Sequence, residues 1–260
     1  MLLNVIFFGV LALLFLGMMA MQIAGHHYAL RRTENDPVAG SDGTAAVEAS
    51  LYALLGLLVA FTFSGAQDRL NARRQLIVQE VQSIGTAYQR LDLLPPQDAA
   101  VLRDEMRQYV DARLSYYHKL ASFAAARAER QQADGLQDRI WSNAVAASGR
   151  ASDPRGATML VLPSLNEMFD VATARYAALR THVPGAIFIL LLSLSLVCAF
   201  FAGIGMAKRR GHPSYLHMLM FAAIMSVTAY VIVNLEFPRA GFVTLHHLDK
   251  FLIEQRASMN

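Results

Sequence analysis

The sequence predicts an all-α membrane protein with four transmembrane helices in a 2 + 2 arrangement and a helical extramembrane domain between the second and third spans. Its composition, with 55% hydrophobic and only 17% charged residues, is too apolar for an ordinary soluble domain. Four apolar segments are long enough to cross a membrane, which takes roughly 20 residues of helix. They occur in two pairs, separated by a long polar segment with helical periodicity. The pattern predicts four regions: the first two spans with their loop (1–66), the helical domain (67–183), spans three and four (184–235), and a tail that packs on the helical domain (236–260).

Flanking polar residues delimit each span. The first runs from Leu2 to about Ala24 and contains no charged side chain. It has no charged leader and is longer than the apolar run of about 7–15 residues in a signal peptide, so we expect it to remain as a helix. The other three spans lie between Glu48 and Asp68, between His182 and Lys208, and between Pro213 and Leu235.

The distribution of cationic residues leaves the orientation in the membrane open. Arginine and lysine near span ends favour the cytoplasmic side. Here the two sides carry similar numbers: Arg31, Arg32, Lys208, Arg209 and Arg210 on one side, and Arg69, Arg73, Arg74, Arg175, Arg180 and Arg239 on the other.

The second span is predicted to continue out of the membrane as one long helix. Apolar residues recur at helical spacings from Asp68 to Leu94, and the first break is Pro95-Pro96. A rigid helix of this kind can transmit movement between the membrane and the helical domain. The next domain helix is expected to begin near Asp98, with the Asp98 carboxylate as its cap. Two more are expected at about 136–147 and 157–182, and a short tail helix is expected after Thr244.

One face of the second span has the pattern of a pore lining. Residues on this face recur every three or four positions, and the apolar stretch ends in basic residues, so an apolar constriction would open into a vestibule that attracts anions. An ordinary membrane helix with arginines at the interface explains the same residues equally well. The predicted lining residues are Leu51, Leu55, Leu58, Thr62 and Gly65, and the predicted vestibule residues are Arg69 and Arg73.

Two further groups of residues stand out beyond the spans. Glu80, Gly85, Thr86 and Arg90 follow the second span, where a packing glycine and an ion pair between helices are favoured over an ion site. Glu236, Pro238 and Arg239 follow the fourth span, where a structural junction with the helical domain is favoured over a ligand site.

The sequence contains no pattern for catalysis, and we expect neither an enzyme nor a cofactor. Walker, GxSxG, HExxH and CxxC motifs are absent. In each of the pairs His26-His27 and His246-His247, the two histidines are adjacent and would lie on different faces of a helix. Cys198 is the single cysteine, so no metal site is expected. His217, inside the fourth span, is a weaker functional candidate. The absence of a dense basic run argues against nucleic acid as a partner.

The segment LLGLLVAFTFSGAQDRLNARRQLIVQEVQSIGTAYQRLDLLP, together with LEFPRAG after the fourth span, resembles a family of bestrophin-like bacterial membrane proteins. Bestrophins are pentameric anion channels with four spans, a helical cytosolic domain between spans two and three, and a pore lined by the second span. The resemblance implies a homo-oligomer, a pentamer, in the bacterial inner membrane, with a cytoplasmic helical domain. Its expected partners are the lipid bilayer, further copies of itself and inorganic ions.

These observations predict an oligomeric ion channel that conducts anions through a pore lined by the second span. The alternative is a non-conducting sensor or scaffold that the spans anchor and whose helical domain binds a protein partner. A helix that runs unbroken from the membrane into the domain suits either function.

Overall fold

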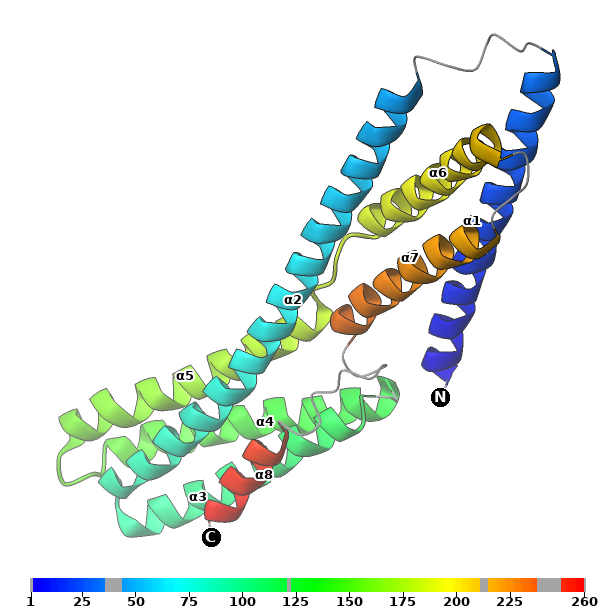
Figure 1. Ribbon diagram of the computed structural model, residues 1–260. Helices are drawn as coiled ribbons and strands as arrows, with labels where there is room; N and C mark the ends of the chain where they lie inside the picture. The colour runs from blue at the N-terminus through cyan, green and yellow to red at the C-terminus, as the bar shows by residue number, and fades with distance from the viewer. Residues whose placement is uncertain (1, 36–43, 121–122, 211–214, 238–248, 260) are drawn as a thin grey trace. The chain divides into compact units, whose positions relative to one another are not determined.

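The computed structural model describes residues 2–35, 44–120, 123–210, 215–237 and 249–259 (Figure 1). These residues form helices joined by short connections, and no strand occurs among them. The helices are α1 (Leu2–Asn35), α2 (Thr44–Arg90), the short η1 (Leu91–Leu93), α3 (Pro96–His118), α4 (Phe123–Ser148), α5 (Pro154–Arg180), α6 (Gly185–Arg210), α7 (Tyr215–Glu236) and α8 (Asp249–Ser258). Four helical stretches, around α1, α2, α6 and α7, are long and apolar enough to cross a membrane. The all-α class with four spans is therefore confirmed.

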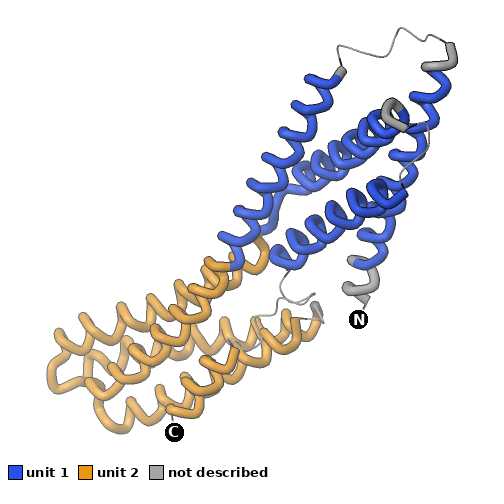
Figure 2. Tube along the Cα trace, in the orientation of Figure 1, with its two compact units in different colours: residues 1–70, 182–244 blue, residues 71–181, 245–260 orange. Residues whose placement is uncertain are grey.

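The chain divides into two compact units, which Figure 2 colours separately. Residues 1–70 and 182–244 form the membrane unit, which contains the spans. Residues 71–181 and 245–260 form the helical unit. Helix α2 contributes to both units, because it continues without a break for 47 residues, about 70 Å at 1.5 Å per residue.

Small residues allow α1 and α6 to pack backbone against backbone in the membrane unit. A Cβ atom on Gly25 would lie 2.0 Å from the carbonyl oxygen of Phe200, and one on Gly203 would lie 2.0 Å from the carbonyl oxygen of Gln22. Ser195, Ala199 and Gly203 follow one another at four-residue spacing along α6. Such small-residue faces let membrane helices approach closely where no hydrophobic effect draws them together.

Helix α2 packs on α6 through its buried face. Leu55 is buried in a cluster with Leu194 and Cys198, and the Tyr52 hydroxyl donates a hydrogen bond to the Cys198 carbonyl oxygen at 3.1 Å. Cys198 is a free, buried thiol.

The helical unit has a continuous apolar core formed by α2, α3, α4, α5 and α8. Its largest fully buried side chains include Tyr109, Met106 and Ile140. The proline pair ends the long helix as predicted, since η1 closes α2 and α3 begins at Pro96.

Two boundaries differ from the sequence prediction. Pro95, not Asp98, is the N-cap residue of α3, and the Asp98 carboxylate instead accepts two hydrogen bonds from Arg150, at 2.8 and 3.1 Å. Helix α4 is much longer than the predicted 136–147, because the alanine-rich stretch before Gly135 has high helix propensity and the single glycine costs only about 1 kcal/mol.

Asp153 caps α5 by accepting a hydrogen bond from the Gly156 amide.

Candidate functional site

The face of α2 that the sequence pattern assigns to a pore lies against the rest of the membrane unit. Leu55 and Thr62 are buried, Leu51 and Leu58 pack around the Leu55 cluster, and Gly65 is half-buried. The Thr62 hydroxyl donates to the Leu58 carbonyl oxygen at 2.7 Å, which satisfies it within its own helix. The predicted lining residues therefore make contacts within the chain.

The two arginines expected in a vestibule also make contacts within the chain. Arg69 donates from Nε to Oε2 of Glu236 at 2.9 Å, and its guanidinium group folds back to within 3.3 Å of a Cβ position on Gly65. Arg73 is buried and donates to the carbonyl oxygens of Ala178 and Thr181 at 3.0 and 2.9 Å. Arg69 therefore connects α2 to the end of α7, and Arg73 connects α2 to the end of α5.

Glu236, at the end of α7, is the centre of a buried junction in the membrane unit. Its side chain is fully buried and accepts hydrogen bonds from Arg69 and, at 3.0 Å, from the backbone amide of Val183. The Nδ1 atom of His182 lies 3.3 Å from the same carboxylate, and the His182 ring stacks on Phe237. The other two residues predicted for this junction, Pro238 and Arg239, lie outside the described residues.

Much of the opposite side of α2 is exposed, and one stripe of exposed residues, which we call the outward stripe, follows the helix from Leu54 to Gln89. From Leu54 to Phe61 it is apolar, with Leu57 52% and Phe61 67% exposed. Beyond the span it becomes polar. Its members recur at spacings of three and four residues: Leu54, Leu57, Phe61, Ser64, Asp68, Asn71, Gln75, Gln79, Gln82, Thr86 and Gln89.

The outward stripe carries almost no charge. Asp68 is the single exposed charged residue of α2 between Ala45 and Gln89, whereas each neighbouring helix α3, α4 and α5 of the helical unit exposes at least two charged residues. Examples are Asp104 and Asp111 on α3, Arg127 and Asp138 on α4, and Glu167 and Arg180 on α5. The sequence analysis did not single out this stripe, although the run of glutamines at helical spacing was visible in the sequence.

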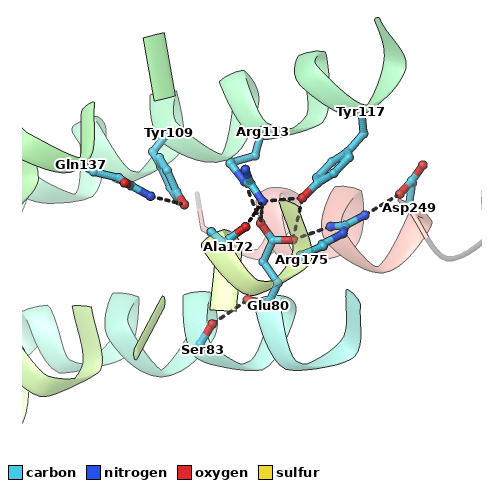
Figure 3. Close-up of polar contacts among 9 residues, drawn as sticks. All are labelled: Glu80, Ser83, Tyr109, Arg113, Tyr117, Gln137, Ala172, Arg175 and Asp249. Atoms are coloured by element: carbon cyan, nitrogen blue, oxygen red, sulfur yellow. Dashed lines mark hydrogen bonds and ion pairs between the residues drawn. The ribbon is translucent and has the colours of Figure 1, made fainter. Parts of the chain in front are cut away.

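The helical unit contains a buried cluster of charged residues centred on Glu80 (Figure 3). Glu80 is fully buried and accepts hydrogen bonds from Arg113 on α3, at 2.7 Å, and from Arg175 on α5. Arg175 also donates to Asp249 of α8 at 3.1 Å. Two arginines thus face two carboxylates, so the cluster is close to electrically neutral and joins four helices.

Tyr117 completes the Glu80 cluster. Its hydroxyl donates to Glu80 at 3.3 Å and accepts from Arg113, and the guanidinium group of Arg175 lies 3.5 Å from the centre of its ring. The buried hydroxyl of Tyr109 nearby accepts a hydrogen bond from Gln137 at 3.1 Å. Sequence reasoning named Glu80 and a partner arginine on another helix without identifying it; the signal for Arg113 was its position within an apolar stripe of α3.

The cluster fixes the ionisation of its members. Burial by itself raises the pKa of Glu80, but the positive charges of Arg113 and Arg175 outweigh burial and hold the pKa of this carboxyl below its usual range. Burial lowers the pKa of Arg113, and the negative charge of Glu80 reverses that effect and raises it. Burial raises the pKa of the Tyr109 hydroxyl to about 12. Glu80 is therefore a carboxylate and both arginines are charged at neutral pH.

The other residues predicted on this part of α2 have separate surroundings. A Cβ atom on Gly85 would lie 3.3 Å from the side-chain amide of Gln255, so glycine here permits a close approach of α8. Thr86 is exposed on the outward stripe. Arg90 donates to the Leu160 carbonyl oxygen of α5 at 2.9 Å.

Among the described residues, no three His, Cys, Asp or Glu side chains come together in a way that could hold a metal ion. His26 is buried in α1 beside the exposed His27, while His246 and His247 lie outside the described residues.

Comparison with known proteins identifies the fold. The sequence matches the family model described as "Bestrophin-like domain" over residues 12–246. Two crystal structures of single-substitution variants of a bacterial Bestrophin homolog from Klebsiella pneumoniae are similar, with TM-scores of 0.70 and 0.71 at 14% and 15% identity. They cover 96% and 97% of this chain, and the matches span 98% and 96% of those chains. A structure of that homolog solved by Zn-SAD phasing has a TM-score of 0.69 at 16% identity, with 95% of this chain and 96% of that chain covered. No curated protein sequence matches the chain.

Proposed function

Because this chain belongs to the Bestrophin-like domain family, we propose that several copies of it assemble in the bacterial inner membrane into an ion channel whose pore is lined by α2. The family resemblance favours a pentamer with the helical unit in the cytoplasm. Inorganic ions and the other copies of the chain are then its partners.

The outward stripe of α2 is the observation that carries this proposal. A face repeated around a symmetry axis meets its own copies, so charged residues on it would repel one another. The stripe largely meets that requirement, since it is apolar from Leu54 to Phe61 and consists of uncharged polar residues from Asn71 to Gln89, and Asp68, where the span ends, is its one charged member. A ring of apolar side chains in the span can close a pore by excluding water, and the uncharged polar side chains beyond it can line a water-filled path for ions.

The proposal changes which residues of α2 line the pore. The stripe from Leu51 to Gly65 and the two arginines below it were predicted to do so, but their side chains contact the rest of the subunit. An anion preference based on Arg69 and Arg73 would require their hydrogen bonds to open. We therefore assign the lining to the outward stripe, with Leu57 and Phe61 as the apolar constriction.

A sensor or scaffold remains the second candidate, supported by the Glu80 cluster. The cluster ties α2 to α3, α5 and α8 through buried ion pairs, so a movement of α2 would be transmitted to the helical unit. A scaffold of this kind would carry no current.

Single-cysteine accessibility tests the channel proposal. The chain has one cysteine, so Cys198→Ser gives a cysteine-free background. In that background, Gln75→Cys or Gln79→Cys would place a thiol on the outward stripe, and Val101→Cys would place one on an exposed site of α3. A charged methanethiosulfonate reagent should change the ionic current through the stripe variants and leave the Val101 variant unaffected. No current from intact, oligomeric protein, or equal effects at all three sites, would contradict the proposed pore.

A further inference from the structure

The composition of α2 beyond the span suggests a basic surface, but its arginine side chains are not exposed. The helix carries four arginines after the span. Arg69 pairs with Glu236, Arg73 donates to two backbone carbonyl oxygens, and Arg90 donates to the Leu160 carbonyl oxygen. Arg74 is half-buried and falls outside the spacing of the outward stripe.

Unlike these arginines, Asp68 has an exposed side chain. It lies on the outward stripe between Ser64 and Asn71 and marks the end of the apolar span. Within the described part of the chain, no ion pair involves its carboxylate, and Arg69 next to it is turned toward Glu236. The negative charge of Asp68 is therefore available to the space that the stripe faces.

We infer that Asp68 is the residue that sets ion selectivity and makes the channel prefer cations over anions. This inference rests on the proposed function. In an assembly of several copies, the Asp68 carboxylates form a ring at the end of the apolar constriction. A ring of fixed negative charge raises the local concentration of cations and excludes anions, and the uncharged amides beyond it add no opposing charge. The prediction from sequence was the reverse, because it counted Arg69 and Arg73 as pore residues.

Reversal potentials of the purified full-length protein in planar bilayers with a KCl gradient test the inference. The wild-type current should reverse near the K⁺ equilibrium potential. Asp68→Asn should move the reversal potential toward zero, Asp68→Lys should move it toward the Cl⁻ equilibrium potential, and Asp68→Glu should retain the wild-type value. Asp138→Asn, which removes an exposed carboxylate of α4, changes the net charge by the same amount and should have no effect.

The outcomes separate the two proposals. A wild-type current that reverses near the Cl⁻ potential, or one that Asp68→Asn and Asp68→Lys leave unchanged, would overturn the role of Asp68 while the channel stands. Silence of the wild type, in protein shown to be oligomeric and folded, would overturn the proposed channel itself.

Discussion

At the scale of single residues, α2 carries charged side chains of two contrasting classes: those held in ion pairs or hydrogen bonds within the chain, and the exposed carboxylate of Asp68. Glu80 belongs to the first class, because it is fully buried between two arginines. Removing one partner of a buried ion pair leaves uncompensated charge and costs about 3–5 kcal/mol. We expect Glu80→Gln to destabilise the helical unit by that amount in chemical unfolding followed by the fluorescence of Trp141, the single tryptophan. Glu167→Gln on the exposed face of α5 is the matched control and should change the free energy of unfolding by less than about 1 kcal/mol.

The same carboxylate predicts a pH dependence. The pKa of Glu80 is lower in the folded protein than the value of about 4.3 in an unfolded chain. Its contribution to stability is therefore fully present above that unfolded value and is lost as the pH falls through the folded pKa. We expect the wild type to lose stability in acid below about pH 4, and the Glu80→Gln variant to show a smaller loss over the same range. Parallel curves for the two proteins would contradict this assignment.

At the scale of elements, the contact between α1 and α6 depends on glycine. A methyl group on Gly203 would lie 2.0 Å from the Gln22 carbonyl oxygen, which is backbone and cannot move aside without shifting a helix. We expect Gly203→Ala to destabilise the membrane unit by about 1–3 kcal/mol and to lower the melting temperature in detergent.

Gly205 provides the control for this prediction within the same helix. Apart from the backbone of its own helix turn and its chain neighbours, no atom lies within 4 Å of a Cβ atom placed on it, so Gly205→Ala should be neutral or stabilise the helix by up to about 1 kcal/mol. Equal effects of the two substitutions would show that helix propensity, and not close packing, governs this contact.

At the scale of the whole molecule, conduction by the proposed channel would depend on the side chains that several copies of α2 place around one axis. Phe61 is the most exposed large side chain on the outward stripe, and a ring of such side chains would form the narrowest, driest part of the path. We expect Phe61→Ala to raise single-channel conductance. Phe63→Ala removes another exposed ring of α2 that lies off the stripe and should leave conductance unchanged. The opposite ranking of the two variants would move the constriction to a different face of the helix.

The sequence by itself determined the class of the protein and its four spans, because span length and helical periodicity are local properties of the chain. Pro95-Pro96 likewise specified where the long helix ends, since proline acts on the residues beside it. The resemblance of Leu54 to Pro95 to bestrophin-like proteins pointed to the family that the match over 12–246 shows.

The tertiary structure alone decided which face of each helix is turned outward and which charges are paired. Residues three and four apart share a face, but periodicity does not say whether that face meets another helix or open space. Leu55 and Arg73 are thus buried within the folded chain, whereas Phe61 and Asp68 are exposed. The partners of Glu80 lie 33 and 95 residues away along the chain, and those of Arg69 and Arg73 more than a hundred. Such pairs form because folding brings distant segments together and buries them, where an unpaired charge is costly, and local sequence carries no record of that distance.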